Sequence, residues 1–216
     1  MIVIFVLLLC SFVCVMVYYF TRYISYCSVD NSLFPEMEIF KIKTNIALLW
    51  TDLQSSLLVT GWLDIRSLDN IDYTNPFFSN DISNNFISFN LAPFNESNAI
   101  IYPLVIKKKY FYDNTKFCPS TISAINGIPN VFNAFILCLK DNSKFSFNID
   151  SNVKYRCIIP YVTTVGDSGI KISDTIFNWK DIMVKYGFLM FDPKCDHYIW
   201  NNTIAKKYFL VLDLFA

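Results

Sequence analysis

The strongest pattern in the chain is an uninterrupted apolar run at its beginning. Residues 2–20 contain no charged residue, no proline and no glycine, and the first charged side chain is Arg22. A helix over this run, rising about 1.5 Å per residue, would span the roughly 30 Å hydrocarbon core of a bilayer. The pattern predicts a transmembrane anchor over residues 1–21 and a juxtamembrane connector over 22–34.

The apolar run differs from a cleaved secretory signal. No basic residue precedes it, its core is longer, and it ends in bulky residues rather than in a small-residue cleavage site. We therefore expect an uncleaved anchor. Its orientation stays open at this point, because Arg22 alone weakly favours a cytoplasmic C-terminal side, whereas the cysteines and sequons below favour an external one.

Residues 35–216 are predicted to form one α+β domain with a mainly antiparallel sheet. Helical spacing of apolar residues over 35–60 favours a helix, although part of this segment also alternates as a strand would. The Asp-, Asn- and Ser-rich stretch 64–85 is typical of a surface loop.

The second half of the chain is rich in strand patterns, separated by turn residues. A proline, Pro103, predicts that one of these strands lies at a sheet edge or is broken. The predicted strands cover 86–92, 100–112, 144–149, 153–165, 182–191 and 206–215, and a short helix is predicted within 120–139.

Composition narrows the function classes. The chain is 54% hydrophobic, and its formal net charge is zero, so no overall field recruits nucleic acid. Five glycines in 216 residues argue against glycine-rich phosphate-binding loops. No cofactor is expected.

Four cysteines lie in the strand-rich half: Cys118, Cys138, Cys157 and Cys195. In an oxidising compartment they would form two disulfides, in one of three connectivities, and Cys27 would be free or intermolecular. The alternative is that all of them are buried, reduced thiols. Their spacing fits no zinc motif, and the single histidine argues against a Cys/His metal site.

Two sequons and one basic patch are candidate surface sites. Asn95 and Asn201 match the glycosylation acceptor pattern, which carries little weight in an asparagine-rich chain. Lys107, Lys108 and Lys109 precede two tyrosines, Tyr110 and Tyr112. Such a patch can bind an anionic glycan, a lipid headgroup or a protein partner, or it can be a solvated strand edge that lysines protect from aggregation.

The sequence contains only weak matches to known catalytic motifs. Residues 165–169, VGDSG, resemble a serine-protease nucleophile loop, but the only histidine follows the serine and the segment is better interpreted as a turn. Cys195 and His197 lie two residues apart and would share one face of a strand. A Cys–His nucleophile pair is therefore an alternative function, that of a thiol-dependent membrane-tethered enzyme.

The layout of anchor, Arg22 and cysteine-bearing domain resembles the per os infectivity factors, small virion envelope proteins of baculoviruses and their nudivirus-like relatives, and among them the fourth factor of the set. Poxvirus entry-fusion proteins share a similar layout. The resemblance implies a non-enzymatic subunit of a multi-protein entry complex on the virion envelope, with an external C-terminal domain. It also implies passage through a host membrane such as the inner nuclear membrane.

The expected partners are accordingly the lipid bilayer, other envelope proteins and a host-cell receptor, but not nucleic acid. A membrane-tethered module that binds a glycan, lipid or receptor is the other alternative.

Overall fold

A computed structural model describes residues 46–59, 62–64, 98–147, 151–161, 166–185 and 187–215. The predicted anchor, the connector, Cys27, Asn95 and the strand predicted at 86–92 lie outside these ranges. The elements in chain order are α3 (Ile46–Leu57), β1 (Leu63–Asp64), β2 (Ala99–Ile106), β3 (Lys109–Tyr110), α4 (Tyr112–Thr115), α5 (Pro119–Asn126), β4 (Val131–Leu139), β5 (Ser143–Phe145), β6 (Tyr155–Pro160), β7 (Ser168–Ile172), β8 (Thr175–Asn178), α6 (Trp179–Lys185), β9 (Leu189–Phe191), β10 (His197–Asn201) and β11 (Lys207–Leu214).

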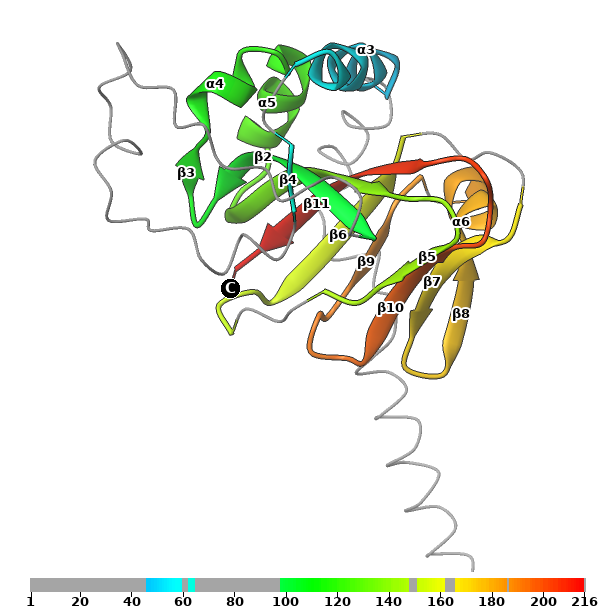
Figure 1. The fold of residues 1–216 in the computed structure, drawn as a ribbon. Helices are drawn as coiled ribbons and strands as arrows, with labels where there is room; N and C mark the ends of the chain where they lie inside the picture. Colours follow the sequence, from blue (N-terminus) through cyan, green and yellow to red (C-terminus); the bar gives the residue numbers. More distant parts are fainter. Residues whose placement is uncertain are drawn as a thin grey trace, which may run out of the picture.

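The strands form two antiparallel sheets (Figure 1). The larger sheet has the order β1-β2-β4-β11-β6-β9, with β3 paired to β2, and the smaller has the order β5-β10-β7-β8. The eight consecutive strands β4 to β11 are divided between the two sheets. The larger sheet contains them in the order β4-β11-β6-β9, and the smaller sheet in the order β5-β10-β7-β8. This interleaving is that of a double-stranded β-helix, a jelly-roll architecture.

A first hydrophobic core fills the space between the two sheets. Phe135 and Leu137 of β4 and Val211 of β11 meet Ile170 of β7 and Ile199 of β10 there. All five are almost fully buried. The inner faces of the sheets thus surround an apolar interior, into which any polar side chain must bring its own partner.

A second core lies on the outer face of the larger sheet, which α3 and α5 cover (Figure 1). Ala134, Ile136 and Cys138 of β4 belong to this core, whereas the alternate residues of β4 face the inter-sheet core. A strand buried on both faces loses its apolar–polar alternation. For this reason the helix predicted within 120–139 is correct only over α5, and the apolar run that follows is the strand β4.

Asp52 joins helix α3 to this outer layer. Its carboxylate accepts hydrogen bonds from the backbone N–H of Thr121, at 2.6 Å, and from the Thr121 hydroxyl, at 2.9 Å. Thr121 lies in the first turn of α5, whose own N-cap residue, Cys118, makes no side-chain cap. Asp52 therefore caps α5 from another helix.

The observed strands differ from two of the strand predictions. Pro103 does not place its strand at an edge, because β2 lies between β1 and β4 and accommodates the proline at a register shift between Pro103 and Val105. The strand predicted at 182–191 begins as helix α6, and only β9 is extended.

The predicted fold class is wrong. The domain is a double-stranded β-helix rather than an α+β ectodomain held by disulfides, and no helix within the described ranges is long and apolar enough to cross a membrane. The four cysteines predicted to pair form no disulfide and are buried. Three of them, Cys118, Cys138 and Cys157, belong to the outer core, whereas Cys195 belongs to the inter-sheet core.

Candidate functional site between the two sheets

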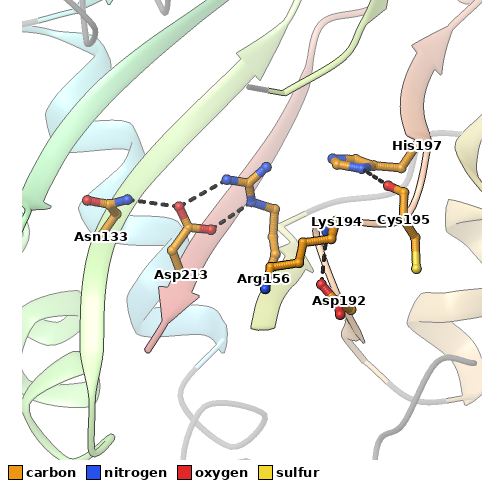
Figure 2. Close-up of polar contacts among 7 residues, drawn as sticks. All are labelled: Asn133, Arg156, Asp192, Lys194, Cys195, His197 and Asp213. Atoms are coloured by element: carbon orange, nitrogen blue, oxygen red, sulfur yellow. Dashed lines mark hydrogen bonds and ion pairs between the residues drawn. The ribbon is translucent and has the colours of Figure 1, made fainter. Parts of the chain in front are cut away.

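A buried ion pair crosses two neighbouring strands of the larger sheet (Figure 2). Arg156 of β6 lies opposite Asp213 of β11 in the strand register. The guanidinium donates from Nε to Oδ1 at 2.6 Å and from Nη2 to Oδ2 at 3.0 Å, and the two side chains are 4% and 2% exposed. Asn133 of β4 adds a third hydrogen bond, from Nδ2 to Oδ2 at 2.9 Å. The carboxylate is thus fixed from both sides.

His197 approaches this pair from the opposite sheet, at the start of β10. Its Nδ1 lies 2.7 Å from the carbonyl oxygen of Cys195. A carbonyl can only accept a hydrogen bond, so Nδ1 carries the proton and Nε2 presents a lone pair. The ring stacks on Phe147, with centroids 5.9 Å apart, and meets the edge of Phe191 at 4.9 Å.

The surroundings keep His197 neutral. Burial is the main cause that lowers the pKa of its imidazole, and the charge of Arg156 lowers it further, against the raising effect of the Cys195 carbonyl. A neutral ring with Nδ1–H fixed leaves Nε2 as an acceptor or a ligand atom.

Arg156 and His197 each leave one buried nitrogen without a hydrogen-bond partner. These atoms are Nη1 of Arg156 and Nε2 of His197. Both side chains contact Phe147, since the guanidinium carbon lies 4.4 Å from its ring centroid. Figure 2 shows the guanidinium between Asp213 and His197, with its free end directed toward the imidazole. Together, these two nitrogens offer one donor and one acceptor.

A second buried cation, Lys207, lies at the other end of the inner face of β11. It alternates with Phe209 and Val211, which belong to the inter-sheet core, and is 2% exposed. Desolvation by burial lowers the pKa of its ammonium.

The predicted Cys195–His197 nucleophile pair is not formed. His197 contacts the main-chain carbonyl of Cys195, and Figure 2 shows the thiol directed away from the ring. Burial raises the pKa of the other thiols, that of Cys118 to about 12 and that of Cys138 to about 11, and it also raises the pKa of Cys157. The disulfides are replaced by buried thiols, the alternative weighed from the sequence.

The predicted basic patch is a hairpin turn at the surface. Lys107 and Lys108 connect β2 to β3 with φ values of 48° and 65°, as in a two-residue type I′ turn. The Lys108 ammonium lies 3.5 Å from the ring centroid of Phe215. Tyr110 donates a hydrogen bond to Asn126, and Tyr112 begins α4. Lys109 and both tyrosines are exposed, so ligand binding at this patch stays a prediction.

The remaining predicted sites have structural roles. The amide of Asn201 is fully buried and donates to the carbonyls of Lys140 and Ala205, so a glycan on it is incompatible with this fold. In the protease-like segment, Asp167 accepts hydrogen bonds from Trp200 and Asn202, which lower the pKa of its carboxyl. Ser168 is buried and begins β7, so the second half of the segment is a strand rather than the turn predicted from the sequence.

The sequence contained one overlooked signal for this site. Arg156 and Asp213 each interrupt a run of apolar residues in a strand, and charged residues are seldom fully buried unless they are paired. The role of His197 could not be found in this way, because its neighbours come from distant parts of the chain.

The comparisons with known proteins point to one family. A model of the aspartyl/asparaginyl beta-hydroxylase family matches residues 95–216, which is more than half of the chain. No curated protein matches the sequence.

Solved structures that resemble the chain do so weakly. One is a protein from Photorhabdus luminescens, with 18% identity over 38% of this chain and a TM-score of 0.29; the match covers 61% of that protein. Another is an oxidoreductase of the 2OG-Fe(II) oxygenase family from Burkholderia pseudomallei, with 8% identity over 55% of this chain and 68% of that one and a TM-score of 0.40. A third is a prolyl hydroxylase from Trichoplax adhaerens in complex with a hypoxia inducible factor peptide, with 11% identity over 82% and 92% of the chains and a TM-score of 0.36.

The family match overturns the resemblance to per os infectivity factors. The virion envelope location, the structural role in an entry complex and the expectation of a non-enzymatic protein are wrong with it, because the matching family is named for an enzyme, a hydroxylase. The alternative of an enzyme fits better, although not through the thiol chemistry first considered for it. The expected protein and lipid partners stay predictions.

The residues present do not fit the iron centre of a non-haem oxygenase. That centre holds Fe(II) on two histidines and one carboxylate, and the whole chain has one histidine. The described residues contain no cluster of three His, Cys, Asp or Glu side chains that could hold a metal ion.

Proposed function

Because the chain belongs to the aspartyl/asparaginyl beta-hydroxylase family, we propose that its inter-sheet site recognises the side chain of a peptide substrate, and that it prefers an asparaginyl carboxamide to an aspartyl carboxylate. The observation that carries this proposal is the pair of buried, unpartnered nitrogens, Arg156 Nη1 and His197 Nε2. The proposal concerns recognition of the substrate group, the step for which the described residues account.

Hydrogen-bond chemistry favours a primary carboxamide. Nη1 of Arg156 can only donate, and Nε2 of His197, in the tautomer fixed by Cys195, can only accept. A carboxamide offers a carbonyl oxygen to the first and an N–H to the second. Each buried polar group left unpaired costs about 1–3 kcal/mol, so a ligand that pairs both nitrogens removes this penalty.

Charge favours the same group. The positive charge of Arg156 is already balanced by Asp213, and His197 is neutral. An aspartyl side chain, with an ordinary pKa of about 3.9, is ionised at neutral pH and has no proton to give Nε2. It would also bring an uncompensated charge into an apolar interior, at a substantial cost in desolvation.

Three short peptides that differ only in a central Asn, Asp or Ala test this proposal. We expect calorimetry with the full chain to show the Asn peptide binding about tenfold more tightly than the Asp peptide, a difference of about 1.4 kcal/mol. His197→Phe keeps an aromatic ring but removes the acceptor, and should abolish the preference.

Lys116→Gln provides the matched control, because it alters an exposed ion pair and should leave binding unchanged. Equal affinity for the Asn and Ala peptides would rule the proposal out, as would a preference for Asn that survives in His197→Phe.

A further inference from the structure

We infer that the guanidinium of Arg156 is a built-in cation that takes the place of a metal ion at this site. It is paired with the carboxylate of Asp213, and its free end is directed toward the imidazole of His197 (Figure 2). This inference is independent of the proposed preference for a carboxamide.

Two parts of a metal site are present around Arg156. Asp213 supplies a carboxylate, and His197 directs Nε2 inward while its Nδ1–H is fixed by a backbone carbonyl. Metal-binding histidines almost always have such a second hydrogen bond, which sets the tautomer and the ring orientation. A carboxylate and an imidazole prepared in this way would ordinarily converge on a divalent cation.

The third part is a fixed organic cation. Arg156 donates to both oxygens of Asp213, and Asn133 occupies a further acceptor position on Oδ2. Three of the roughly four acceptor positions of Asp213 are therefore occupied, two of them by a bidentate, charge-assisted pair. The guanidinium keeps its positive charge at all physiological pH values, so it also repels a second cation from the His197 lone pair.

The number of side chains that could bind a metal ion also argues against a metal at this site. No second imidazole can come from any part of the chain, because His197 is its only histidine. The residue that follows Arg156 on the inner face of β6 is Ile158, which is fully buried and apolar. The site therefore retains the charge pattern of a carboxylate–cation–imidazole centre with a cation that cannot dissociate.

The single histidine makes the inference directly measurable, because the full chain gives one imidazole signal in its NMR spectrum. We titrate Co(II) into the wild type and into Arg156→Gln, which removes the charge but keeps an N–H donor for Asp213. Calorimetry follows binding, and paramagnetic broadening of the imidazole signal reports its location. We expect no saturable site at His197 in the wild type. Arg156→Gln should acquire a saturable Co(II) site, at least tenfold tighter than any residual binding to the wild type, and this site should be lost in Arg156→Gln/His197→Phe.

Lys207→Gln is the matched control, because it removes another buried cation from the same sheet face and should gain no Co(II) affinity. Stoichiometric Co(II) binding to the wild type with broadening of the imidazole signal overturns the inference, and so does a folded Arg156→Gln that gains nothing. If circular dichroism shows that Arg156→Gln is unfolded, the inference is tested instead by thermal unfolding of the purified wild type with and without EDTA. Its melting temperature should be unchanged by EDTA, and a fall on chelation overturns the inference.

Discussion

Arg156 and Asp213, 57 positions apart in sequence, form a bidentate ion pair inside the protein, with an Nε–Oδ1 distance of 2.6 Å. Removing one member leaves the other as an unpaired buried charge, so we expect Arg156→Met or Asp213→Leu alone to lower the free energy of unfolding by about 3–5 kcal/mol. The double variant, in which both charges are absent, should be more stable than either single variant. Urea unfolding of the four proteins measures this coupling, and additive losses would contradict it.

The cap that Asp52 provides to α5 should be a separate source of stability. Asp52→Ala leaves the buried N–H and hydroxyl of Thr121 without their acceptor, and we expect a loss of about 2 kcal/mol in the free energy of unfolding. Asp113→Ala removes only an exposed pair with Lys116 and should cost less than about 0.5 kcal/mol. Equal losses in urea unfolding would show that Asp52 does not act as a cap.

Two glycines should respond in opposite ways to alanine. A Cβ on Gly169 would lie 2.6 Å from Cζ2 of Trp200 and would clash with the carbonyl of Phe177, so Gly169→Ala should cost about 3 kcal/mol. Gly127 has a φ of −81° and its Cβ would meet nothing closer than 3.5 Å. Gly127→Ala should therefore be neutral or stabilising by up to about 1 kcal/mol. Thermal unfolding distinguishes the two, and a tolerated Gly169→Ala would show that β7 and β10 pack less closely.

His197 should make the protein less stable in mild acid. Burial lowers the pKa of its imidazole below the ordinary value of 6.5. As the pH falls below 6.5, the unfolded chain therefore takes up a proton that the folded chain does not. Stability should decline at up to about 1.4 kcal/mol per pH unit. His197→Phe removes this contribution, so its stability between pH 6.5 and 5 should be flatter. Parallel profiles for the two proteins would contradict the lowered pKa.

The cysteines should be unreactive thiols rather than disulfides or nucleophiles. At pH 7.5 the native protein should show no alkylation of Cys118, Cys138 or Cys157 by iodoacetamide, because burial both shields the thiols and raises their pKa. Cys195, also buried, should behave in the same way. In guanidinium chloride all four should react without prior reduction, as read by mass spectrometry. Rapid native labelling of Cys195 alone would restore the thiol-enzyme hypothesis.

Sequence patterns predicted the helix at α3 and several strands, where one face of the element differs from the other. They failed where this contrast is lost. Phe132, Phe135 and Leu139 have helical spacing by chance in β4, whose residues Ala134–Leu139 are buried on both faces by two separate cores. No local pattern reveals that a strand lies between two cores, because the second core is supplied by distant residues.

The candidate site was harder to predict than the fold. Cys195 and His197 were singled out because they lie two residues apart in the sequence, yet the hydrogen bond to His197 uses the carbonyl of Cys195 rather than its thiol. The neighbours of His197 come from β6, β9 and β11 and from the segment after β5, and only the pairing of two sheets brings them together. The cysteine count and the apolar N-terminal run suggested a viral envelope protein, but neither feature reports on the site.

The contact between Asp52 and Thr121 indicates that the folded domain extends beyond the segment that matches the family. The family match begins at residue 95, whereas α3, which carries the Asp52 carboxylate, ends at Leu57. A chain trimmed to the homologous segment would expose the part of the outer core that α3 covers and would leave the first turn of α5 without the Asp52 cap. We therefore expect the cooperative domain to begin at or before Ile46, earlier than the family match alone would place it.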